Sequence, residues 1–427
     1  MAQAIPLVAG TLSSVIRLFI ALLVLAAVFS TPAAAQTIVA TIAGEDATEA
    51  NSQSKLARDA GGTIYLVYAG PSGGFSQIYL ARSSDGGRRW RIIPVTAGRV
   101  HARFPSLVID RGGTAHVAWT QYDGGTGRVY YARYREDRWT PPVRVSTGLQ
   151  YAGIPSIAVD AAGTVHLVWY GIRAQAPVIR TRHGSIYEIL YTHSQGARWL
   201  APVVISPGIP DAINPTLAAD ESGRLHSAWY QFDSRVYQAR YTQRDAAWAR
   251  PVDVSTGGSD AASVAMAVES GGTIHLVWEQ RSDSGTRIFY AEKTSRWSGQ
   301  QLISAPGQRA CCPSVAVDAQ RRVYVVWESD DQLYLSRRDG NWAGIDRLTS
   351  QAGNHNPVLG GSGDHVDLAW VQQSGQNRQV RFATIAGGPS AMATPSPSPR
   401  GIIVLIVIAL LIIWQVRRMR AAQRRAS

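Results

Sequence analysis

The chain has 427 residues, of which 45% are hydrophobic and 17% charged, with 40 Gly, 21 Pro and 13 Trp. This composition is typical of a folded protein with a large core and excludes a chain that is disordered throughout. The net charge is +12, but much of it comes from Arg17, Arg400 and the arginines of 417–427. The rest of the chain carries a mild positive excess without a basic run, so nucleic acid is not an expected partner.

The N-terminus predicts export. Arg17 precedes an apolar run over 18–29, and Ala33 and Ala35 fit the small-residue pattern of a signal-peptidase site. We therefore expect a signal peptide over 1–35 and a mature chain that starts at Gln36.

The C-terminus predicts a membrane anchor. Residues 387–400 form a Pro/Ser linker, 401–416 form an apolar segment, and 417–427 form a basic tail. The arginines should stay in the cytoplasm, so we expect a single-pass membrane protein whose N-terminal part lies at the cell surface. A helix over 401–416 would be only about 24 Å long at about 1.5 Å per residue, against ~30 Å of hydrocarbon. A sorting tail that is later cut off is therefore the alternative.

Two series of tryptophans reveal a repeat of about fifty residues. The first series is Trp119, Trp169, Trp229, Trp278, Trp327 and Trp370, with Tyr68 in the same place at the start, and the second is Trp90, Trp139, Trp199, Trp248, Trp297 and Trp342. Segments such as "FPSLVIDRGGTAHVAW" and "IPSIAVDAAGTVHLVW" read as a strand, a tight turn and a second strand. A third strand ("RVYYARY") and a fourth ("PPVRVS") follow in most units. Four strands per unit predict an all-β β-propeller.

The count favours seven four-stranded blades over 36–386, with six or eight as alternatives. The last unit, from about Asn356 to Ile385, has only three strands, whereas 37–43 is a lone strand. We expect this N-terminal strand to complete the last blade, because an open ring would expose unpaired strand edges. We expect a monomer.

The repeated aromatic and histidine positions are expected in the core. His116, His166, His226 and His275 each stand three residues before a tryptophan. Equivalent positions in packed sheets lie roughly 10 Å apart, whereas zinc needs its nitrogen ligands at about 2 Å. These histidines are therefore predicted to be structural, and we expect neither a metal nor a cofactor.

Residues 83–90 read "SSDGGRRW", in which Ser83, Asp85, Gly87 and Trp90 match the S-x-D-x-G-x-x-W Asp box, or BNR repeat. The chain thus resembles the sialidase superfamily. The motif is a folding device in which Asp accepts backbone N–H groups, Gly takes a positive φ and Trp anchors the turn. Glycine doublets make the kelch propellers an alternative resemblance, but it is the weaker one because the doublets recur in only three units.

The resemblance implies a catalytic set that this chain does not match. Sialidases of this superfamily would use three arginines to hold the substrate carboxylate, a Tyr activated by a Glu as the nucleophile, and an Asp as the acid. The first of these arginines would lie in an R-I-P motif before the first Asp box. Here the mature chain offers only Arg58 and Arg82 before Ser83. We therefore expect divergence from the catalytic sialidases.

Ligand-binding candidates fall in loops on the face opposite the Asp box. Aromatic, acidic and arginine side chains together suit a sugar. The ligand-binding candidates are Arg99, His101, Arg103, Tyr122, Tyr170, Arg173, Tyr230, Asp233, Arg281, Arg309, Cys311 and Cys312, and the catalytic candidates are Glu279, Asp283 and Glu328. Cys311 and Cys312, the only cysteines, could form a strained disulfide or remain two thiols.

These features predict an exported, membrane-anchored module that binds a glycan or another cell-surface ligand. A divergent sialidase, or another glycoside hydrolase or lyase, is the enzyme alternative. A scaffold for protein partners is the third possibility.

Overall fold

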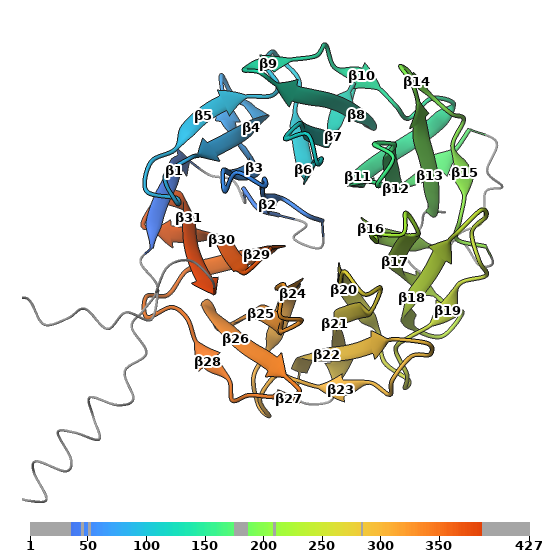
Figure 1. Ribbon diagram of the computed structural model, residues 1–427, viewed down its shortest axis with the longest axis vertical. Helices are drawn as coiled ribbons and strands as arrows, with labels where there is room; N and C mark the ends of the chain where they lie inside the picture. The colour runs from blue at the N-terminus through green and yellow to red at the C-terminus, as the bar shows by residue number, and fades with distance from the viewer. Residues whose placement is uncertain are drawn as a thin grey trace, which may run out of the picture. The chain divides into compact units, whose positions relative to one another are not determined.

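The computed structural model describes residues 36–43, 47–49, 53–174, 187–207, 211–282 and 285–386. Over these ranges the chain is all-β, without a helix, and its strands form seven sheets arranged as a ring (Figure 1). The predicted signal peptide, linker, membrane segment and basic tail lie outside the described residues. No helix that could cross a membrane occurs within those residues.

Each sheet is one blade, and the blades follow one another along the chain. The first two contain β2 (Leu56–Arg58), β3 (Ile64–Ser72), β4 (Phe75–Ser83) and β5 (Arg91–Pro94), then β6 (Ala102–Ile109), β7 (Ala115–Asp123), β8 (Thr126–Arg135), β9 (Arg138–Trp139) and β10 (Val143–Arg144). The third contains β11 (Leu149–Val159), β12 (Val165–Arg173), β13 (Glu188–Gln195), β14 (Arg198–Trp199) and β15 (Val203–Val204). The fourth contains β16 (Ala212–Ala219), β17 (Leu225–Phe232), β18 (Tyr237–Arg244) and β19 (Val252–Asp253).

The remaining blades repeat this order. The fifth contains β20 (Ala261–Val268), β21 (Ile274–Ser282), β22 (Gly285–Lys293) and β23 (Gln301–Leu302). The sixth contains β24 (Ala310–Val317), β25 (Val323–Ser329), β26 (Gln332–Asp339), β27 (Asn341–Trp342) and β28 (Asp346–Arg347). The seventh contains β29 (Asn354–Ser362), β30 (His365–Ser374), β31 (Asn377–Ala386) and β1 (Thr37–Ala43). The prediction of a seven-bladed propeller is confirmed.

The outer edge departs from four strands in three blades. In the second, third and sixth blades the fourth strand is split into two short pieces that both pair with the third strand. Pro141 and Pro142 interrupt the edge in the second blade, and Pro202 does so in the third. Proline lacks the N–H that a ladder needs, so pairing stops there.

The N-terminal strand closes the ring, as predicted. β1 pairs antiparallel with β31, from Thr37 opposite Phe382 to Ala43 opposite Asn377. The Thr37 hydroxyl also donates to the carbonyl of Gly87, at 2.7 Å, in the first blade. The N-terminal strand therefore ties the last blade, with which it pairs, to the first blade.

Both tryptophan series are structural. All six members of the first series are fully buried or nearly so, within the cores between blades. Members of the second series pack edge-on against a tyrosine of the preceding blade, as in Tyr131–Trp199 and Tyr191–Trp248, with ring centroids 5.1 and 5.0 Å apart. The tryptophans that reveal the repeat in the sequence therefore lie where neighbouring blades pack against each other.

The four repeated histidines are buried and bonded on both nitrogens. In His116, His166 and His226, Nδ1 meets a tyrosine hydroxyl on the third strand and Nε2 meets an Asp of the turn after the first strand. His275 has the same arrangement with Tyr290 and Glu269. Burial lowers the pKa of all four imidazoles, although the neighbouring carboxylate partly offsets it. These histidines act as cross-strand links.

This arrangement predicts that acid destabilises the propeller. The unfolded state takes up protons at these histidines near their ordinary pKa of about 6.5, whereas the folded state takes them up only at lower pH. The free energy of unfolding should therefore fall as the pH drops from 7 through 6, measured by urea denaturation. His226→Gln should reduce this slope by about a quarter if the four sites contribute equally. An unchanged slope in His226→Gln would show that other groups cause the loss.

Candidate functional site at the mouth of the central channel

Each inner strand from the second blade onward carries a β-bulge near its start. The register with the second strand shifts there, and one non-glycine residue takes a left-handed φ of 48–57°. The six residues are Phe104, Ile154, Asn214, Ser263, Cys312 and Asn356. Such conformations are costly and are often found beside functional sites. They form a ring at the end of the channel from which the inner strands start.

In the second, fifth and sixth blades, the residue after the first-series tryptophan hydrogen-bonds to a residue of this ring. Thr120 Oγ1 accepts the N–H of Ile154 at 2.9 Å. Glu279 accepts the N–H of Cys312 at 3.1 Å, and Glu328 accepts the N–H of Asn356 at 3.2 Å. In each case the acceptor lies in the preceding blade. The same position is Tyr170 in the third blade and Tyr230 in the fourth, so this repeat position supplies the floor of the mouth.

One arc of the mouth is aromatic. Tyr151, Tyr170 and Tyr187 pack with ring centroids 4.9–5.9 Å apart, and the hydroxyls of Tyr151 and Tyr170 lie 3.4 Å apart. Tyr122 hydrogen-bonds to Tyr151. Burial raises the pKa of Tyr170 and of Tyr230 to about 12. These phenols therefore stay protonated at neutral pH and can donate as well as stack.

The next arc is acidic. The charge of Glu279 helps to raise the pKa of Tyr230. Burial also raises the pKa of Glu279, and the charge of Glu328 adds to this. Glu328 binds His355 Nδ1 at 2.9 Å, and both side chains are mostly buried. The arc thus combines a carboxyl group whose pKa is raised with a histidine oriented by a carboxylate.

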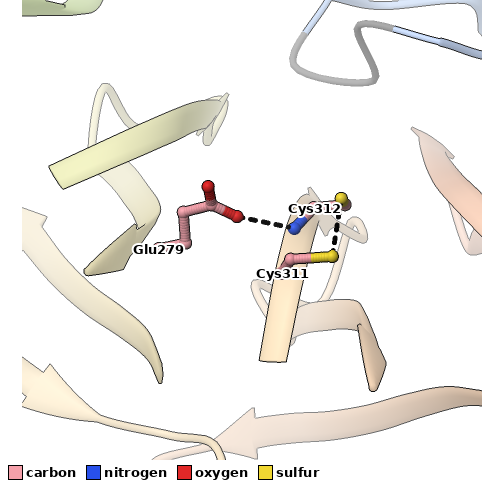
Figure 2. Close-up of side chains that lie close together, drawn as sticks. All are labelled: Glu279, Cys311 and Cys312. Atoms are coloured by element: carbon pink, nitrogen blue, oxygen red, sulfur yellow. Dashed lines mark hydrogen bonds between the residues drawn. The ribbon is translucent and has the colours of Figure 1, made fainter. Parts of the chain in front are cut away.

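Cys311 and Cys312 lie within the acidic arc. Figure 2 shows Glu279 reaching to the backbone N–H of Cys312, beside the two cysteine sulfur atoms. Glu279 lies on β21 and Cys312 on β24, and the two sulfur atoms are 2.8 Å apart. Both cysteines are free thiols in this structure and partly exposed. Of the two alternatives left open by the sequence, the structure therefore has the thiol form.

The segment before β2 completes the mouth. Thr48 donates to the carbonyl of Asn356 at 2.8 Å, and Glu49 forms an ion pair with Arg103 at 2.5 Å. Gln53, in the first blade, donates to the carbonyl of Pro215 in the fourth blade at 3.1 Å. The Gln53 side chain therefore reaches across the channel. A cavity of about 360 Å³ beyond it is lined by the inner strands.

Lys55 is the one buried lysine of the described residues. Its ammonium donates to the carbonyl of Pro105 at 2.7 Å, and burial lowers its pKa to about 7. At the corresponding position, Ser106, Ser156 and Ser314 each accept an N–H from the inner strand of the next blade. Lys55 thus occupies an inter-blade contact position, and we assign it a structural role.

The predicted site residues separate into two groups. Arg103, Tyr122, Tyr170, Tyr230, Glu279, Cys311, Cys312 and Glu328 contribute to the connected arcs of the mouth. Arg99, His101, Arg281 and Arg309 are exposed, and His101 accepts the N–H of Ser76. Arg173 is paired with Glu188, and Asp233 accepts backbone N–H groups of its own turn. Asp283 lies outside the described residues.

Several mouth residues were not predicted. Tyr151, Tyr187, Asn214, Ser263 and His355 are brought there by the bulges or by loops between blades. A signal was present in part, because Asn214 directly precedes the proline of the repeated inner-strand segment, and His355 stands one residue before the corresponding asparagine. The position directly before this proline recurs in most units.

The "SSDGGRRW" turn lies away from the mouth, between β4 and β5. Asp85 accepts the N–H groups of Arg88 and Arg89 and the hydroxyl of Ser83. Trp90 donates to the carbonyl of Gly87 and packs against Phe382 of the last blade, with centroids 5.1 Å apart. The turn therefore stabilises the seam where the ring closes.

Comparison with known proteins supports the fold. No family model and no curated protein matches the chain. An ulvan lyase, solved bound to -[GlcA(1-4)Rha3S]-, is 11% identical, with a TM-score of 0.58 over 83% of this chain and 98% of its own. The polysaccharide lyase Uly1 is 8% identical, with a TM-score of 0.51 over 80% and 92%. A protein of unknown function from Dyadobacter fermentans DSM 18053 is 12% identical, with a TM-score of 0.51 over 67% and 95%.

Sialidases are matched more distantly. A Hadza microbial sialidase is 13% identical, with a TM-score of 0.42 over 75% of this chain and 73% of its own. At all of these identities the likeness concerns the fold alone, so the comparisons show that the chain is a β-propeller similar in fold to the polysaccharide lyases above.

Proposed function

We propose that this protein binds carbohydrate at the mouth of its central channel, between the aromatic and acidic arcs. The observation that carries the proposal is the packing of Tyr151, Tyr170 and Tyr187, whose ring centroids lie 4.9–5.9 Å apart. Stacked phenol rings offer apolar faces to a sugar ring, while their hydroxyls and the adjacent carboxylates can bond to sugar hydroxyls. The propeller fold shared with polysaccharide lyases is consistent with such a ligand.

A second candidate function is cleavage of the bound glycan. The specific observation is that Glu328 holds His355 Nδ1 at 2.9 Å in the same arc as Glu279, whose pKa is raised by burial. A carboxyl group and a carboxylate-held imidazole are groups that general acid–base catalysis uses. In both candidates the propeller faces the outside of the cell, since 401–416 is expected to cross the membrane.

The experiment exposes the full-length chain, in detergent, to immobilised sialylated, uronate-containing and neutral glycans. Retention of protein and release of sugar are both scored. Tyr170→Ala should weaken retention about tenfold or more, because it removes a ring at the centre of the aromatic arc. Tyr170→Phe, which keeps the ring, should weaken it less.

Glu279→Gln and Glu328→Gln separate the two functions. Loss of sugar release with retained binding would support catalysis, whereas intact glycans with every variant would support a binding module. A retention that Tyr170→Ala leaves unchanged would contradict the proposed site. Arg99→Ala, at an exposed position, serves as the matched surface control.

A further inference from the structure

Two thiols and a carboxylate from neighbouring blades converge at the mouth (Figure 2). Cys311 and Cys312 lie on β24, and Glu279 lies on β21 of the preceding blade. Both sulfur atoms and a carboxylate oxygen lie within 4.8 Å of one another. Three potential metal ligands therefore share one small volume, although the two cysteines are thirty residues from the glutamate in sequence.

The bulge explains how adjacent cysteines can present both sulfurs together. In a regular strand, successive side chains point to opposite faces of the sheet. Cys312 instead has a left-handed φ of 57° at the register shift between Cys311 and Ser314. This turn of the backbone brings its Sγ to 2.8 Å from that of Cys311.

We propose that Glu279, Cys311 and Cys312 form a binding site for a thiophilic divalent cation of the zinc class. With zinc–sulfur bonds of about 2.3 Å, two tetrahedral sulfur ligands lie about 3.8 Å apart, so rotation of the cysteine side chains must widen the present 2.8 Å separation for the cation to bind. The cation forms two bonds to sulfur and one to oxygen. Each thiol loses its proton to solvent, so no oxidant or reductant takes part. A fourth position stays open for water, as in zinc sites with three protein ligands.

The surroundings suit a cation. Glu279 is held by the N–H of Cys312 and by Ser263, which fixes its orientation toward the sulfurs. Glu328 pairs in register with Cys311 and adds a second negative charge nearby. Contacts of this kind around first ligands commonly change metal affinity by about 10–100-fold.

The test is a titration of the full-length chain, kept reduced by a phosphine, with Cd²⁺ and then Zn²⁺. We expect an ultraviolet cadmium–thiolate band that saturates at a single ion per chain and is displaced by zinc. Cys311→Ser and Cys312→Ser should each remove most of the band. Glu279→Gln removes a ligand, so it should keep the thiols but weaken affinity more than the about 10–100-fold change typical of residues around the ligands.

Glu328→Gln is the matched control, since it removes a carboxylate beside the site but outside the trio. It should change Cd²⁺ affinity less than Glu279→Gln does. The proposal is overturned if the reduced chain, with both thiols titratable, shows no band and retains no zinc after gel filtration. It is also overturned if Glu328→Gln abolishes binding while Glu279→Gln does not, because the ion would then sit with Glu328, Asp331 and His355. Glycan retention is measured separately, so either proposal can fail alone.

Discussion

Trp229→Ala is expected to destabilise the propeller by about 3–5 kcal/mol, because it opens a large cavity in a core that cannot easily collapse. The side chain is fully buried between blades and donates to Gln231 at 3.0 Å. Urea denaturation followed by tryptophan fluorescence and circular dichroism measures the change. A loss below about 1 kcal/mol would contradict the role of the first tryptophan series as core.

Two phenylalanine variants refine this prediction. Trp229→Phe and Trp169→Phe remove similar volume from fully buried positions. The indole N–H of Trp169 has no partner among the described residues, whereas that of Trp229 bonds to Gln231. Trp229→Phe should therefore cost about 1 kcal/mol more than Trp169→Phe.

Gly87→Ala is expected to cost several kcal/mol through two effects. Gly87 has a φ of +86°, where an L-residue costs roughly 1–2 kcal/mol. A Cβ there would also lie 2.4 Å from the ring of Phe382 on β31. Because Phe382 belongs to the last blade, the clash would push apart the seam that closes the ring. Thermal unfolding of the variant measures this loss.

Gly86→Ala is the matched control for the closure seam. Its φ is +75°, and a Cβ there would meet nothing within 4 Å. Both variants should be destabilised by backbone strain, but only Gly87→Ala should also clash with Phe382. Gly87→Ala should therefore lose about 1–3 kcal/mol more stability than Gly86→Ala. Equal destabilisation of the two variants would mean that Phe382 moves aside and that the contact between the first and last blades tolerates the added methyl group.

Much of the fold could be predicted because each blade repeats a local pattern. The spacing of Trp119, Trp169 and their successors reports the blade period, and the missing fourth strand of the last unit predicts the pairing of β1 with β31. The split outer strands were not predicted, although Pro141, Pro142 and Pro202 were visible. Their effect depends on which strand becomes the sheet edge.

The candidate site was predicted only in part. Glu279, Glu328, Tyr170 and Tyr230 share one repeat position after a tryptophan, so the sequence could place them on one face. Five of the six left-handed bulge residues directly precede a proline, which is a local signal for the bulge but does not show which groups it brings together. The contact of Gln53 across the channel leaves no local motif.

The sequence by itself therefore determined the all-β class, the seven-fold repeat and the closing strand, because strand patterns, turns and buried tryptophans are local and periodic signals. Only the tertiary structure decided that Glu279 meets Cys311 and Cys312, and that His355 meets Glu328. Those contacts join neighbouring blades, so they depend on how the blades pack around the ring.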